Sequence, residues 1–152
     1  MTELPVFTLA DLEAVPRVVL PSFTKTDAWR LGTIAARAIE SSGLDLAVDI
    51  VIEGDLVFRA KFAGTSEEND PWLARKAATA RAFGVPSLLV RRRSEADPAA
   101  FADVDDELAL HGGAIPLYVD DALIATITMS GEPDVVDHQY CRAAVDEYLA
   151  TL

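Results

Sequence analysis

The two histidines are the side chains most able to hold a metal ion or carry a proton. His138 follows Asp134 by about one helical turn and begins an apolar stripe on the last predicted helix. There it could ligate a metal or move a proton, or it could be a core-edge histidine held by a carboxylate. His111 precedes Gly112 and Gly113, and this glycine-rich loop could carry it to a ligand or leave it on the surface.

Lys76 lies on a helical face that also carries aromatic residues. Trp72, Lys76, Thr79 and Phe83 are spaced so that they share one side of a predicted helix. A lysine between aromatic rings could hold an anionic group of a ligand, or its alkyl chain could lie over a packed surface. The segment 130–133 enters another helix, where capping is favoured over anion binding because Glu132 and Asp134 already supply negative charge.

The sequence contains no signature of a known catalytic site. It has no glycine-rich nucleotide loop, no H-E-x-x-H zinc motif and no G-x-S-x-G nucleophile motif. Cys141 is the single cysteine, which excludes an internal disulfide and a multi-cysteine metal site and is typical of a reducing compartment. The residues alone therefore do not decide whether the chain is an enzyme.

The chain carries a strong negative charge that is unevenly distributed. The formal net charge is -12, which repels phosphate backbones, so we expect no nucleic-acid partner. Charged residues between Ser94 and Asp121 are all acidic, and the triplet 91–93 just before them is all arginine. Such a triplet forms either a local ion-pair patch or a contact with an anion or another subunit.

Length and hydropathy favour one cytoplasmic domain. The 152 residues fit one ordinary domain, spanning 1–152. No stretch is apolar for long enough to span a bilayer, so we expect no membrane partner. The acidic N-terminal residues also lack the apolar run of a signal peptide.

Hydrophobic periodicity predicts an α+β fold in which helices flank an antiparallel sheet built from two hairpins. Residues 88–93 could form a strand or a short helix. The final helix should carry a stripe of Cys141, Val145, Tyr148 and Leu152. Predicted helices cover 9–15, a segment capped by Thr24 or Thr26 and ending at 42, a segment capped by Asn69 or Asp70 and ending at 83, and 133–152. An extended segment covers 17–20. The hairpins cover 46–63, with the turn Gly54-Asp55, and 115–129, with the turn Asp120-Asp121.

Two blocks of the sequence resemble the GlcG/HbpS-like family, also called the haem-degrading domain family. Residues 76–83 are similar to its Lys-Ala-x-Thr-Ala-x-x-Phe helix, and residues 112–119 are similar to its Gly-Gly-x-x-Pro strand. The strand that ends at Ser130-Gly131 resembles the family's Val-Ser-Gly. In the stand-alone, uncharacterised branch of the family, the block of Asn69, Trp72 and Lys76 and the pair Asp137-His138 recur.

The resemblance implies a profilin-like fold with α/β/α layers around a five-stranded antiparallel sheet, and homo-oligomers of the octamer or decamer class. It also implies binding of haem or a related small anionic ligand, while no activity follows from it. His138 or His111 would then be the iron ligand, and Lys76 or Arg75 would lie near the propionates. The other candidate ligand-binding residues are Trp72, Gly112 and Gly113.

Two alternatives remain at this point. One is an oligomeric scaffold or interaction protein without catalytic activity, since the sequence shows no catalytic constellation. The other is an enzyme acting on an organic anion, with Lys76 and His138 meeting across a subunit interface.

Overall fold

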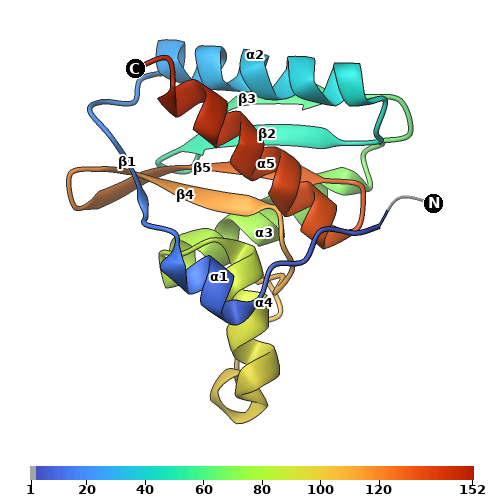
Figure 1. Cartoon of the computed structure of the whole chain (residues 1–152), viewed down its shortest axis with the longest axis vertical. Coiled ribbons are helices and arrows are strands. Elements are labelled where there is room, and N and C mark those ends of the chain that lie inside the picture. Colours follow the sequence, from blue (N-terminus) through green and yellow to red (C-terminus); the bar gives the residue numbers. More distant parts are fainter. Residues whose placement is uncertain (1–2) are drawn as a thin grey trace.

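A five-stranded sheet lies between helices in the computed structural model, which describes residues 3–152 (Figure 1). The elements in chain order are α1 (Leu9–Ala14), β1 (Val18–Leu20), α2 (Lys25–Ser42), β2 (Ala47–Ile52), β3 (Asp55–Lys61), α3 (Asn69–Phe83), α4 (Ser87–Ala96), the short 3-10 helix η1 (Pro98–Phe101), β4 (Ala114–Val119), β5 (Ala122–Ser130) and α5 (Asp134–Leu149).

The sheet is mixed, so the expectation of a purely antiparallel sheet is wrong at one edge. The strand order is β1-β4-β5-β2-β3, and β1 runs parallel to β4 while the other neighbours are antiparallel. A tight turn forces two strands to be antiparallel, but β1 reaches β4 only after most of the chain has intervened, so its direction is not constrained in this way. The profilin-like arrangement stays a prediction.

The first hairpin turns one residue earlier than predicted. Glu53 and Gly54, with φ of 48° and 86°, form the turn, and Asp55 already pairs with Ile52. Two successive residues with positive φ match the twist of a two-residue hairpin turn. A bulge between Ile50 and Val51 then shifts the register, so the regular alternation predicted for β3 is interrupted.

Helices α2 and α5 cover one face of the sheet, and α3 covers the other (Figure 1). On α2, Leu31, Ala35 and Ile39 are buried in the main core. On α5, Cys141, Val145 and Tyr148 are buried in the same core. Leu152 is instead exposed and lies beyond the end of α5, so its place in the stripe was wrongly predicted.

Local capping signals set some of the helix ends close to where the sequence predicted them. Thr8 and Thr24 each form a capping box at the start of α1 and α2. Gly43 and Gly84 adopt the left-handed conformation that ends α2 and α3. Among residues 3–152, no helix is both long and apolar enough to cross a bilayer.

Residues 88–93 form part of a helix, which resolves the ambiguity left by periodicity. Leu88 and Leu89 on α4 pack with Leu12 of α1 in a small second core. The arginine triplet on the same helix forms local ion pairs: Arg91 with Asp134 and Glu95, Arg92 with Glu95, and Arg93 with Glu13.

Candidate functional site

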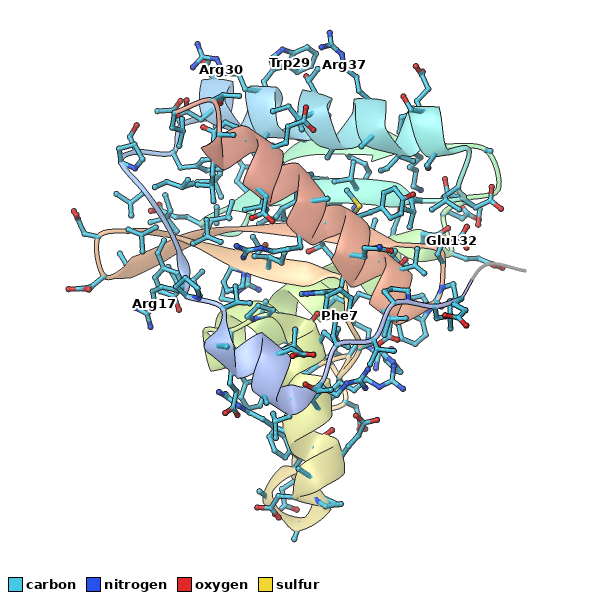
Figure 2. All side chains as sticks on the ribbon, in the orientation of Figure 1. Phe7, Arg17, Trp29, Arg30, Arg37 and Glu132 are labelled. Carbon is cyan, nitrogen blue, oxygen red and sulfur yellow. The ribbon has the colours of Figure 1, made fainter. Side chains whose placement is uncertain are left out.

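An open pocket of about 350 Å³ lies where the first turns of α3 meet the loop before β4 and the connection from β5 to α5. We call it the lysine pocket, because Lys76 lies at its buried side. Glu132 stands on the β5–α5 connection, at the edge of the molecule in Figure 2. The lining residues are Asn69, Trp72, Lys76, His111, Ser130, Gly131, Glu132, Asp134 and Asp137.

A buried ion pair joins α3 to α5 in this pocket. The Lys76 Nζ lies 2.8 Å from Asp137 Oδ2, and the two residues are only 3% and 1% exposed. Lys76 also donates a hydrogen bond to the Met129 carbonyl at 3.1 Å. Gly113 makes room for these contacts, because a Cβ there would lie 3.1 Å from Lys76 Nζ and would collide with the Met129 carbonyl oxygen.

Asp137 also fixes the backbone that leads into α5. Its second oxygen, Oδ1, accepts a hydrogen bond from the Glu132 N–H at 3.0 Å. Burial raises the pKa of Asp137 to about 6, even though the Lys76 ammonium acts in the opposite direction. At neutral pH the carboxylate is therefore mostly ionised, and the pair carries both charges with little access to solvent.

Asp134 organises the loop that carries His111. Its Oδ2 accepts a hydrogen bond from the Gly112 N–H at 2.8 Å, and its Oδ1 accepts one from Arg91. Burial raises the pKa of Asp134, but the Arg91 guanidinium and the Gly112 N–H outweigh it and hold the pKa below its usual range. A Cβ on Gly112 would lie 2.7 Å from the Asp134 carbonyl oxygen, so this close approach favours glycine.

His111 and Trp72 lie together at the outer side of the pocket. Their ring centroids are 5.6 Å apart with the rings at 76°, and the His111 side chain is 49% exposed. The His111 Nδ1 lies 4.0 Å from Asp134 Oδ2. Desolvation lowers the pKa of His111 below its ordinary value, which favours the neutral imidazole at neutral pH. The Arg75 guanidinium lies over the Trp72 ring, 5.1 Å from its centroid.

His138 lies outside the lysine pocket. It is 3% exposed, and its ring packs edge-on against Phe7, a residue labelled in Figure 2, with centroids 4.8 Å apart. The Nδ1 atom is buried and has no hydrogen-bond partner among residues 3–152. Burial lowers the pKa of His138 to about 4, and the nearby Arg142 adds to this effect. The ring faces a separate, mostly apolar pocket of about 320 Å³.

The structure therefore brings most of the predicted site residues together and separates one of them. Trp72, Lys76 and His111 line the lysine pocket, with Gly112 and Gly113 packed behind it and Arg75 on the Trp72 ring. The Lys76 ammonium group is already paired with Asp137, so it is not a free cation in this structure.

Two carboxylates of this site were noted in the sequence but were not among the predicted site residues. Asp137 and Asp134 are the partners of Lys76 and of the His111 loop. A signal for Asp137 existed, since a lysine within a helix of small residues needs an acid if it is buried.

The Lys76–Asp137 pair should contribute to stability cooperatively. Lys76→Met and Asp137→Asn each leave one buried group without its partner, so each should lower the free energy of unfolding by roughly 3–5 kcal/mol. The double variant should lose less than the sum of the two. Urea unfolding at pH 7 measures all three. The exposed pair Lys25–Asp55 (3.7 Å) is the matched control, for which Lys25→Met and Asp55→Asn should each change stability by about 1 kcal/mol or less. If the free energy lost by the double variant equalled the sum of the two single losses, the cooperative contribution of the Lys76–Asp137 pair would be contradicted.

Acidification should destabilise the fold through His138. The unfolded histidine, with an ordinary pKa of 6.5, binds a proton between that pH and about 4, whereas the folded one does not. Stability is thus lost as the pH falls through this window. His138→Phe should retain about 3 kcal/mol more stability than the wild type on acidification from pH 7 to pH 4. Urea unfolding across this pH range, with His111→Gln as the more exposed control, measures the difference. If the free energy of unfolding fell by the same amount with pH in His138→Phe and in the wild type, His138 would not be the cause of the acid destabilisation.

Comparison with known proteins places the chain among sequences of similar length. The UPF0303 protein of Streptomyces avermitilis is 34% identical over 148 residues, covering 93% of this chain and 91% of the relative. A UPF0303 protein of Burkholderia orbicola is 35% identical over 128 residues, covering 81% of this chain and 78% of the relative.

Solved structures share the fold. The Ybr137w protein superimposes with a TM-score of 0.83 at 30% identity, covering 93% of this chain and 88% of that one. HbpS superimposes with a TM-score of 0.68 at 23% identity, covering 89% of this chain and 94% of that one. A PduOC:Heme complex gives 0.67 at 21% identity, covering 85% and 94%, so these last two show the fold alone. Residues 23–146 match the family model described as "Haem degrading protein HbpS-like", and the chain belongs to this family.

Proposed function

We propose that this protein binds haem or a related iron tetrapyrrole at the lysine pocket, with His111 as the iron ligand. The observation that carries the proposal is the position of His111 between Asp134 and Trp72. Haem is the first ligand to test, because the family is described as haem-degrading and the PduOC:Heme complex has the same fold.

The surroundings of His111 fit an iron ligand. Histidines that ligate metals usually direct the N–H of their other ring nitrogen toward a carboxylate or carbonyl group. The Nδ1 of His111 lies 4.0 Å from Asp134 Oδ2, so a proton on Nδ1 would face this carboxylate. The lone pair of Nε2 would then be available to iron. The lowered pKa of His111 favours the neutral form that ligation requires.

The surroundings of His138 fit an iron ligand less well. Its Nδ1 is enclosed without a hydrogen-bond partner among the described residues, so a proton there would be buried and unsatisfied. The favoured tautomer therefore carries the proton on Nε2. Neither nitrogen then offers an accessible lone pair, and Phe7 packs edge-on against the ring.

The remaining groups divide the roles that a tetrapyrrole needs. Trp72 provides an aromatic surface, and Arg75, which lies over that ring and donates a hydrogen bond to the Asp106 carbonyl at 2.9 Å, has no carboxylate partner among the described residues and would meet a propionate. Lys76 is already paired with Asp137, so we assign the propionates to Arg75 alone. A bound haem would supply an iron with a further coordination position, and these residues would hold and orient it.

Hemin titration of the purified protein tests this site. Wild-type protein should shift the Soret band at micromolar hemin. His111→Ala should abolish the shift, and Asp134→Asn should weaken binding by about 10-fold or more, because the second ring nitrogen loses its carboxylate. His138→Phe is the matched control and should bind as the wild type does. If the wild type showed no Soret shift, haem binding would be contradicted. If His138→Phe lost the shift and His111→Ala kept it, the choice of His111 as the iron ligand would be contradicted.

We also propose that the chain forms a homo-oligomer of the octamer or decamer class, which would suit the alternative role of a scaffold. The support from this structure is that both β1 and β3 are edge strands of the sheet, and that Trp29 and Leu56 are large exposed apolar residues near the β3 edge. Open sheet edges are usually covered or paired in stable proteins.

Light scattering tests the proposed assembly. The measured mass should correspond to eight or ten chains of 16.3 kDa. A mass of one chain at micromolar protein concentration would contradict the proposal.

A further inference from the structure

We propose that an aromatic groove between α2 and β3 binds the acidic end of a second copy of this chain. This assignment rests on the proposed homo-oligomer. The groove, called the Trp29 groove, has a volume of about 340 Å³ and is lined chiefly by Trp29, Thr33, Arg37, Phe58 and Phe62. It lies beside the unpaired edge of the sheet, because β3 is the last strand in the order.

The sequence builds this groove through one glycine of α2. Gly32 is buried, and a Cβ there would lie 2.5 Å from the Phe58 ring, so the absent side chain lets the ring lie against the helix. Trp29 then packs at 67° to Phe58 with centroids 5.9 Å apart, yet remains 65% exposed. Tryptophan and arginine are among the residue types that contribute most to the binding energy of protein interfaces, and here an exposed tryptophan lies next to an arginine.

The outer side of α2 also carries free positive charge. Figure 2 shows Arg30, Trp29 and Arg37 projecting from α2 away from the sheet. Arg37 has no carboxylate within 4.0 Å among residues 3–152, while Arg30 makes only a 3.4 Å contact with Asp27. Glu40 and Arg59 also line the groove, but Arg59 is paired with Asp49 and Asp70, so the positive charge available to a partner comes from Arg37 and Arg30.

The acidic end of the chain has the complementary composition. Phe83 and Phe101 stack with centroids 5.7 Å apart, and Phe83 is 38% exposed. Acidic residues flank Phe101 in sequence, and within the described part of the chain none of them has a lysine or arginine partner within 4.0 Å. These exposed residues, which we call the acidic end, are Asp97, Asp103, Asp105, Asp106 and Glu107.

The two surfaces cannot meet within one copy. Figure 1 places α2 at one end of the longest axis and the segment after α4 at the other. A contact between them therefore joins two copies head to tail, and repetition of a head-to-tail contact produces a closed ring or a filament. Aromatic side chains would fill the groove, and the aspartates would meet Arg37 and Arg30, which also sets the orientation of the contact.

Charge exchange between two variants tests the contact directly. Arg30→Glu with Arg37→Glu makes the groove acidic, and Asp103→Lys with Asp106→Lys makes the acidic end basic; none of these four side chains is buried. Each variant alone should fall to the 16.3 kDa mass of one chain in light scattering, because its contact now joins like charges. An equimolar mixture should recover the wild-type mass, because each altered surface meets a surface of opposite charge.

The control variant carries a charge change of the same size at residues outside the proposed contact. Asp121→Lys with Glu147→Lys alters exposed residues outside both surfaces and should keep the wild-type mass. Thermal unfolding checks that each variant is folded, and Trp29→Ala should lower the mass without any change of charge. An oligomer that persists in both charge variants, or a mixture that stays monomeric, would overturn this contact while leaving the homo-oligomer intact. A monomeric wild type would overturn both proposals.

Discussion

The ion pair between Lys76 and Asp137 is the constraint around which the candidate site is arranged. Two charges so far from solvent are tolerated only when each is paired and hydrogen-bonded, and here the Met129 carbonyl and the Glu132 N–H complete the set. These contacts tie α3, the end of β5 and the start of α5 together at one place. Gly113 follows from the same constraint, because a side chain there would collide with the Met129 carbonyl that accepts the hydrogen bond from Lys76.

The two histidines illustrate how burial separates residues of the same type into different roles. His111 is half exposed, faces a carboxylate and shares its pocket with an aromatic ring. His138 is enclosed beneath Phe7, and its buried nitrogen lacks a partner among the described residues. Both are more acidic than free histidine, yet only His111 combines a neutral ring with access from solvent. For this reason we prefer His111 to His138 as the proposed iron ligand, although the position of His138 at the start of an apolar stripe made it a candidate from the sequence.

Local signals predicted much of the fold, and non-local contacts explain what they missed. Thr24 and Gly43 bound α2 because capping depends on residues within a turn or two. The direction of β1 depends on β4, which no local pattern encodes. In the site, the lysine helix and the double glycine were recognisable as motifs, but the partner of Lys76 stands 61 residues further along the chain. Only the packing of α5 on the sheet brings that carboxylate within reach.

The parallel pairing of β1 with β4 has a consequence for the order of folding. Val18 pairs with Leu117, so this contact closes a very long loop, and closing such a loop is entropically slow compared with forming either hairpin. During synthesis, β1 must wait until the second hairpin has left the ribosome. Phe7 must wait still longer, because His138 belongs to the last helix. The contacts of β1 and Phe7 therefore form only after elements much later in the sequence are in place.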